Sequence, residues 1–316
     1  MNKREMILSL AQGGQALPYV PAAFFLHFPP AFHAGQASVE KHLEYFRYTG
    51  MDFIKIQYEA TFPHRPEIQR PDDWARLPRL GREFFAGQLE AVEGLVRAAR
   101  REAVIVLTLY SPFMCAGQSA STETVEAHLR REPEKVRRGL EIITDSLLGF
   151  VRDCIRVGVD GFYMSTQGGE AGRFADPRIF EEFIRPYDLV LMEAAQRACA
   201  FNILHVCDYV RDYDDFTPFV AYPGTVVSSP LKVGGRRLAP RQAAELFKRP
   251  YMGGLERLGV IARGTPDQIR QAAEAVLAEA PSRFILAADC TVPGDTPWDN
   301  LKIAIDAAHA HHPAEA

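Results

Sequence analysis

The sequence contains no apolar run long enough to cross a membrane and no segment typical of a secretory signal. No stretch of its 316 residues approaches the roughly 18 apolar residues that a membrane helix needs. The N-terminus, MNKREMILSLAQGG, begins with charged residues, but its apolar run is too short for a signal peptide, and no cleavage-type sequence follows. We therefore expect a soluble, cytoplasmic protein.

The charge distribution gives no indication of nucleic-acid binding, and the cysteine count gives none of a disulfide framework. Lys and Arg number 36 against 40 Asp and Glu, the two signs are well mixed, and the formal net charge is −4. No basic stripe exists that would bind nucleic acid or an anionic membrane. The five cysteines are odd in number, and in a reducing compartment clustered Cys and His indicate metal binding or catalysis.

Glycine-rich phosphate-binding motifs are also missing. No GxGxxG or GxxxxGK[ST] element follows any expected strand, which argues against a nucleotide-binding fold. The chain does contain short apolar runs, rich in β-branched and aromatic residues, that alternate with longer segments of helical period. These runs are continuously apolar, as in the buried strands of a parallel sheet. The eight expected strands are residues 20–28, 51–58, 103–110, 159–166, 201–207, 224–230, 251–255 and 284–290.

Eight strands, each followed by a helix, favour a closed α/β fold, the (β/α)8 TIM barrel, over an open doubly wound sheet. One such domain accounts for residues 1–316, with a short N-terminal extension and a frayed tail, HHPAEA. The proline-rich segment 60–84 is expected to form a loop over the mouth of the barrel. The clearest helical segments are residues 84–101, 134–158 and 265–280.

The last of these segments begins with a helix-start signal. Thr265 is a suitable N-cap, and Pro266 occupies the first helical position. The segment 296–309 repeats this Thr-Pro start, so we expect another helix to begin there.

Reactive side chains of such a barrel belong at the carboxyl ends of its strands. His205 and Cys207 lie there on the fifth strand, and their i, i+2 spacing points them to the same face. Cys290 ends the eighth strand, so all three can meet above the barrel. One imidazole and two thiolates form a normal zinc ligand set, and no fourth Cys or His occupies a comparable strand end, which leaves the open position of a catalytic site.

The competing interpretation is that these cysteines only pack in the interior. Free cysteines are among the most buried residues, and an isolated His-x-Cys is more often packing than a ligand pair. For Cys115, Cys154 and Cys199, which lie in a loop or on helix faces, we adopt this interpretation and expect no functional role.

Other polar residues at strand ends are candidates for the wall of a substrate pocket. Each of them could instead serve only to satisfy nearby backbone groups. The predicted substrate-binding residues are His27, Gln57, Tyr163, Gln167 and Asp289. Further candidates at strand ends are Glu59, Tyr110, Ser165, Ser228 and Ser229.

Three segments resemble the uroporphyrinogen decarboxylase superfamily, and the resemblance covers nearly the whole chain. They are GFYMSTQGGE with RPYDLVLMEAA after it, NILHVCDYV, and YMGGLERLGVIARGTPDQI running into FILAADCTVPGDTPWDNLKIAIDAA. In this superfamily true decarboxylases use no metal, whereas corrinoid-dependent methyltransferases carry zinc on a His-x-Cys…Cys set. His205, Cys207 and Cys290 match that set. Decarboxylases also carry an arginine-rich segment near the first strand, but VPAAFFLHFPP has no arginine for a polyanionic substrate.

The resemblance therefore implies a zinc-dependent methyltransferase that moves a methyl group between a corrinoid, such as methylcobalamin, and a small thiol or methylated substrate. The direction of transfer stays open. Because the chain lacks a DxHxxG corrinoid-binding signature, the corrinoid is expected on a separate protein that docks over the barrel mouth. Two alternatives remain, namely decarboxylation of a porphyrinogen or a smaller carboxylate, and a non-catalytic barrel that binds zinc or a corrinoid.

Two positions depart from the patterns of these relatives. Asp208 follows Cys207 where many relatives have glycine, so the loop conformation is expected to differ. The related methionine-synthase barrel takes a glutamate ligand from strand six, and Ser228 and Ser229 stand in that region of this sequence.

Overall fold

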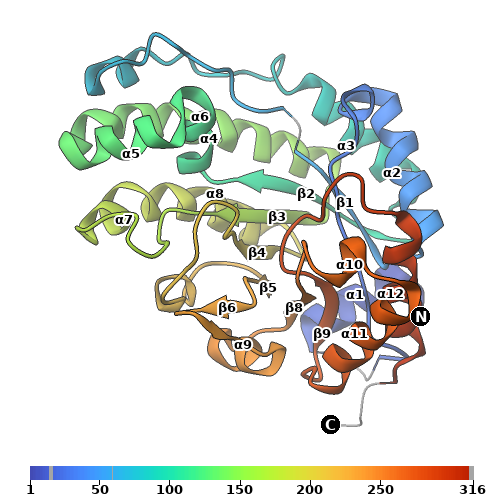
Figure 1. Cartoon of the computed structure of the whole chain (residues 1–316). Coiled ribbons are helices and arrows are strands. Elements are labelled where there is room, and N and C mark those ends of the chain that lie inside the picture. Colours follow the sequence, from blue (N-terminus) through green and yellow to red (C-terminus); the bar gives the residue numbers. More distant parts are fainter. Residues whose placement is uncertain (14–16, 59, 313–316) are drawn as a thin grey trace.

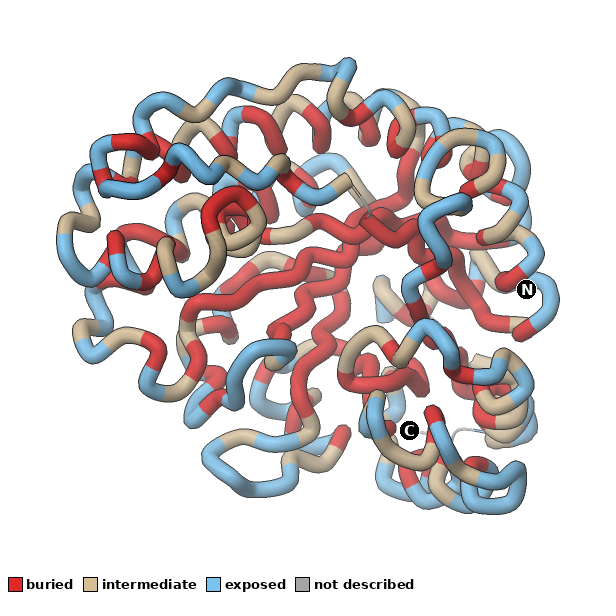
Figure 2. The backbone as a smooth tube through the Cα atoms, turned by 45° about the horizontal axis from the view of Figure 1, so that its top comes forward, coloured by how far each residue is buried: buried red, intermediate tan, exposed pale blue. Residues whose placement is uncertain are grey.

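A seven-stranded parallel sheet forms the centre of the computed structural model, which describes residues 1–13, 17–58 and 60–312 (Figure 1). Its residues are almost entirely buried, as the red colour of these segments in Figure 2 shows, because helices surround the sheet. This burial agrees with the continuous apolar runs of the sequence. In hydrogen-bonded order the strands are β1 (Phe53–Ile56), β2 (Val104–Tyr110), β3 (Gly161–Thr166), β4 (Ile203–Val206), β5 (Val226–Ser228), β8 (Tyr251–Leu255) and β9 (Phe284–Ala288).

The first of the eight predicted strands, residues 20–28, differs from the prediction. It is an extended segment that makes only isolated parallel bridges, between Ala22 and Leu286 and between Leu26 and Val292. On its other side the backbone N–H of Asp52 donates to the carbonyl of Ala22. Pro21 has no N–H to donate, which limits a regular ladder here. The structure is thus a curled, barrel-like sheet of seven regular strands, with this segment between β9 and the start of β1.

The helices confirm the three segments predicted most clearly. They correspond to α3 (Ala86–Ala99), α6 (Pro133–Val157) and α11 (Pro266–Ala278). The other helices that follow the first strand region are α2 (Gly35–Thr49), α4 (Pro112–Ala120), α5 (Thr122–Arg131), α7 (Arg178–Phe183), α8 (Arg185–Ala198), α9 (Pro240–Phe247), α10 (Val260–Arg263) and α12 (Trp298–Ala310). Short 3-10 turns occupy η1 (Pro30–Phe32), η2 (Pro71–Arg76) and η3 (Thr217–Phe219), and β6 (Lys232–Val233) pairs with β7 (Arg236–Arg237) in a small hairpin.

The two Thr-Pro helix starts behave differently. Thr265 caps α11 as predicted, because its hydroxyl accepts a hydrogen bond from the backbone N–H of Gln268. At the second start, α12 begins only at Trp298, with Pro297 at the N-cap position and no side-chain cap. Thr296 instead donates its backbone N–H to the carbonyl of Pro293 in the preceding turn.

The predicted N-terminal extension is a helix, α1 (Lys3–Gln12), that packs against the amino ends of the strands. Arg4 makes two hydrogen bonds of 2.6 Å with the carboxylate of Asp160, just before β3. Arg283, just before β9, donates to the carbonyl of Leu10. The helix thus covers the end of the sheet opposite to the carboxyl ends of the strands.

The proline-rich segment 60–84 does not form the predicted loop over the mouth. Its central turn η2 packs on α6, where the buried ring of Trp74 lies against Gly139 and donates a hydrogen bond to His128. Of the described residues in this segment, only Thr61 lines the large cavity at the carboxyl ends of the strands. The apolar side chains of the segment bury themselves against the outside of α6, which explains the difference.

At the C-terminal end of the described chain, Nδ1 of His312 donates a hydrogen bond of 2.9 Å to the carbonyl of Pro18. The rest of the tail predicted to fray, residues 313–316, lies outside the described residues.

Over the part of the chain that is described, none of the helices combines the length and the apolar character needed to span a bilayer.

Candidate metal centre

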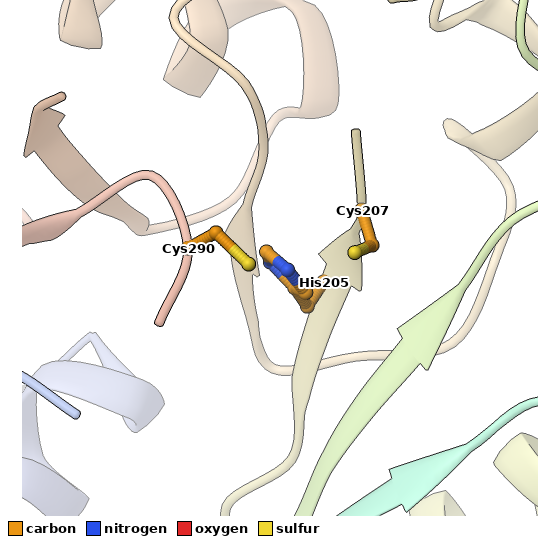
Figure 3. Close-up of side chains that lie close together, drawn as sticks. All are labelled: His205, Cys207 and Cys290. Atoms are coloured by element: carbon orange, nitrogen blue, oxygen red, sulfur yellow. The ribbon is translucent and has the colours of Figure 1, made fainter. Parts of the chain in front are cut away.

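Three donor side chains meet at the carboxyl ends of two strands. His205 lies in β4, Cys207 is the first residue after this strand, and Cys290 comes two residues after the end of β9. Their ligand atoms all lie within 4.8 Å of one another. Figure 3 shows both cysteine side chains turned toward the imidazole. Because β5 and β8 separate β4 from β9 in the sheet, the curl of the sheet brings these residues together.

The distances and burial of these side chains fit one metal ion. Zinc bonds of about 2.3 Å to sulfur and about 2.0–2.1 Å to nitrogen place tetrahedral ligand atoms roughly 3.5–3.8 Å apart, so small side-chain rotations suffice. The Nε2 atom of His205 is buried and has no hydrogen-bond partner among the described residues. A buried polar atom without a partner is costly, and a metal ion would satisfy it. No second group of this kind occurs in the described part of the chain.

The two thiols of the site influence each other. The hydrogen bond between them lowers the pKa of Cys207 well below that of an ordinary thiol and raises the pKa of Cys290. The neighbouring His205 lowers the pKa of Cys207 further. In contrast, burial raises the pKa of Cys115 and Cys154, so these two thiols stay protonated, as expected for packing residues.

The three residues line one wall of a cavity of about 550 Å³. The predicted pocket residues His27, Gln57, Tyr163 and Gln167 line the same cavity, as do Tyr110 and Ser165. Ser228 and Ser229 are buried and do not line it. Glu59 lies outside the described residues.

Asp289 is placed differently from the other predicted pocket residues. It does not line the large cavity but borders a neighbouring one of about 260 Å³, together with Asp208. Its carboxylate accepts a hydrogen bond of 2.8 Å from the backbone N–H of Arg257. Successive residues of an extended chain point to opposite sides, so Asp289 turns away when Cys290 faces the ligands.

Two cations in the cavity wall were missed by the sequence analysis. Lys55 is buried, and its Nζ atom lies 4.7 Å from the ring centroids of both Phe25 and Tyr163. It also donates to the hydroxyl of Thr108 at 3.1 Å. A lysine inside an apolar strand, two residues before Gln57, was the signal for an inward-facing charge.

The second cation, Arg257, gave no such signal, because it lies in a loop. Its guanidinium stacks over the ring of Tyr209 at 4.7 Å, beside the exposed entrance of the cavity. The course of the loop after β8 brings Arg257 to the cavity, and the pattern of apolar strands in the sequence does not predict the course of a loop.

Comparison with known proteins identifies the family. The family model of uroporphyrinogen decarboxylase (URO-D) matches residues 29–311. The chain belongs to the URO-D family. This confirms the resemblance seen in the sequence, while the family as a whole does not fix which reaction this URO-D family protein catalyses. Among curated proteins no relative matches the chain.

Solved structures similar to this URO-D family protein share its fold at low identity. A methyltransferase from Methanosarcina mazei is 14% identical, with a TM-score of 0.78 over 98% of both chains. A B12-independent methionine synthase from a Shewanella species is 11% identical, with a TM-score of 0.53 over 92% of this chain and 97% of the other. A β-mannanase from the blue mussel Mytilus edulis is 11% identical, with a TM-score of 0.54 over 93% and 92%. These similarities support the barrel-like α/β fold.

Proposed function

We propose that this URO-D family protein is a zinc-dependent methyltransferase that moves a methyl group between a corrinoid and a small thiol or methylated substrate. The observation that carries the proposal is the convergence of His205, Cys207 and Cys290 in the wall of a cavity. Three protein ligands leave one of the four positions of zinc open, which is typical of catalytic zinc sites. A small molecule in the cavity can reach that position.

The chemistry of the donor set supports thiol activation. A free thiol with a pKa near 8.5 is mostly protonated at neutral pH, and zinc bound at these residues would supply the positive charge that holds it as a thiolate. The carboxyl ends of β4 and β9 position the three ligands, and His205 and Cys207 are buried in the cavity wall. The volume of about 550 Å³ lies in the usual range of small-molecule sites.

The methyl carrier is proposed to arrive on a separate protein. The chain has no DxHxxG signature that would hold a corrinoid itself. Tyr209 and Val210, which follow Cys207 in the chain, line the cavity and are 65% and 50% exposed. Exposed apolar side chains at the entrance are suited to contact with a partner protein.

The decarboxylase reaction that gives the family its name is less well supported by this cavity. A porphyrinogen carries several carboxylates, which proteins bind best with arginine. The described residues that line the cavity include one arginine, Arg257, and one lysine, Lys55. The segment 20–28 contributes no arginine either.

A non-catalytic zinc barrel would require a closed site with four protein ligands. Among the described residues, the group of possible metal donors has three members, and no carboxylate or fourth cysteine joins it. This composition favours a catalytic role.

Metal analysis followed by a methyl-transfer assay tests the proposal. We expect about one zinc per purified chain, and zinc-dependent consumption of methylcobalamin when a panel of small thiols is offered. The reverse direction is assayed with methylated thiols and reduced cobalamin. A chain that neither contains nor takes up zinc would refute the proposal, and release of carbon dioxide from a porphyrinogen by such a metal-free chain would establish the decarboxylase alternative.

A further inference from the structure

The imidazole of His205 has two ring nitrogens in very different surroundings. Ser228 is the partner of His205 in the register between β4 and β5. Its hydroxyl oxygen lies 3.3 Å from Nδ1, and both side chains are buried. The other nitrogen, Nε2, has no hydrogen-bond partner in the described part of the chain. The hydroxyl of Ser228 therefore occupies one nitrogen and leaves Nε2 available as the metal-binding atom.

We propose that Ser228 is a positioning residue that selects the tautomer of His205 for metal binding. Its oxygen accepts the proton of Nδ1, so that the lone pair of the neutral imidazole is on Nε2. A neutral imidazole has one N–H and one lone pair, and only the lone pair binds a metal. A hydrogen-bond partner on the far nitrogen fixes both the tautomer and the ring orientation. This inference rests on the zinc site of the proposed function.

The phenol ring of Tyr163 is a second constraint on the orientation of the imidazole. The Tyr163 ring lies against the imidazole, with centroids 4.8 Å apart and planes at 32°. The imidazole is thus held at Nδ1 by the serine oxygen and on one face by the phenol ring.

The location of Ser228 argues against two other roles, namely contact with substrate and coordination of the metal. It does not line the cavity, so it does not contact substrate there. It faces the side of the imidazole away from Nε2, so it is not the fourth ligand in this arrangement. The related methionine-synthase barrel has a glutamate ligand in this region. Here Ser228 instead contacts Nδ1 of the ligand histidine, on the side opposite to the metal.

Zinc affinity of the full-length chain is the first test. Ser228→Ala removes the acceptor, and we expect zinc to bind about 10- to 100-fold more weakly, measured by competition with a chromogenic chelator. Ser228→Thr keeps the hydroxyl and should restore most of the affinity. Ser229→Ala is the matched control, because Ser229 is equally buried but its hydroxyl lies beside the phenol of Tyr251, 3.3 Å away.

The tautomer itself is read from ¹⁵N-labelled histidine in the zinc-loaded protein. We expect a slowly exchanging proton on Nδ1 of His205 in the wild type and in Ser228→Thr, and fast exchange of that proton in Ser228→Ala. This measurement on the wild type tests the inference even where the alanine variant does not fold.

The outcomes separate this inference from the proposed function. A wild-type chain that takes up no zinc would overturn both. Zinc binding that is equal in the wild type and in Ser228→Ala, or a proton found on Nε2 with the metal on Nδ1, would overturn only the role of Ser228.

Discussion

The side-chain amide of Gln167 donates a hydrogen bond to the sulfur of Cys207 across 3.5 Å. The two residues follow neighbouring strands, β3 and β4, and the backbone N–H of Cys207 also donates to the carbonyl of Thr166. A hydrogen bond to a thiolate withdraws electron density from the sulfur and tunes its reactivity. In a methyl-transfer enzyme this bond would direct the methyl group away from a ligand cysteine and toward the substrate.

Replacement of Gln167 by leucine tests this relationship. Gln167→Leu keeps a side chain of similar size but removes the N–H donor, so we expect iodoacetamide to alkylate Cys207 several-fold faster in the zinc-loaded protein. Peptide mass spectrometry gives the rate at each cysteine. Cys290 in the same molecule is the internal control, and an unchanged rate at Cys207 would show that the hydrogen bond does not restrain it.

Replacement of either cysteine ligand should remove zinc without unfolding the chain. Cys207→Ser and Cys290→Ser lose a thiolate at the end of a strand, outside the packed centre of the sheet, so the circular dichroism spectrum should persist while bound zinc falls far below one per chain. Cys199→Ser, at a half-buried cysteine outside the site, should keep its zinc. Unfolding of both ligand variants would instead assign these cysteines to the structural core.

Asp188 should make the protein less stable as the pH rises toward 7. Burial raises the pKa of this carboxyl group in α8 to about 7, although Thr166 and Tyr222 donate hydrogen bonds to it. In an unfolded chain the pKa of Asp is about 3.9. The folded state therefore binds the proton more tightly, and the resulting stability is complete below about pH 4 and is lost as the pH passes through about 7.

Asp188→Asn is neutral throughout and should lack this dependence. Between pH 5 and pH 8 we expect the wild type to lose roughly 2 kcal/mol of unfolding free energy relative to the variant. Urea denaturation at several pH values measures the difference. Parallel pH profiles for the two proteins would contradict the raised pKa.

Two glycines should respond to alanine in opposite directions. A Cβ atom at Gly161, the first residue of β3, would lie 1.6 Å from the carbonyl oxygen of Phe201, so Gly161→Ala forces two backbones apart. We expect a loss of more than about 3 kcal/mol or an insoluble protein. At Gly149, within α6, a Cβ meets no atom within 4 Å, and Gly149→Ala should gain about 0.5–1 kcal/mol.

Urea denaturation of both glycine variants provides the comparison, and each serves as the control for the other. Equal stabilities would mean that β3 and the residues before β4 do not approach as closely as the structure shows.

The sequence predicted elements best where burial is uniform. β2 and α6 agree with their apolar patterns to within a residue or two, because each pattern reflects a local requirement for burial. The segment 20–28 was equally apolar but makes only isolated bridges, since apolar character predicts burial and does not ensure a regular hydrogen-bond ladder. Lys55 was missed because a charge in an apolar strand needs partners, here Thr108 and two aromatic rings, that lie far away in the chain.

The sequence by itself determined the alternation of strands and helices, the spacing that points His205 and Cys207 to one face, and the family to which the chain belongs. Only the tertiary structure decided that Cys290 lies close to these two residues, that Asp289 borders another cavity, and that Ser228 contacts Nδ1 of the imidazole. The physical reason is that periodicity fixes the side of a strand on which a residue lies, whereas the curl and register of the whole sheet fix which distant side chains share that side.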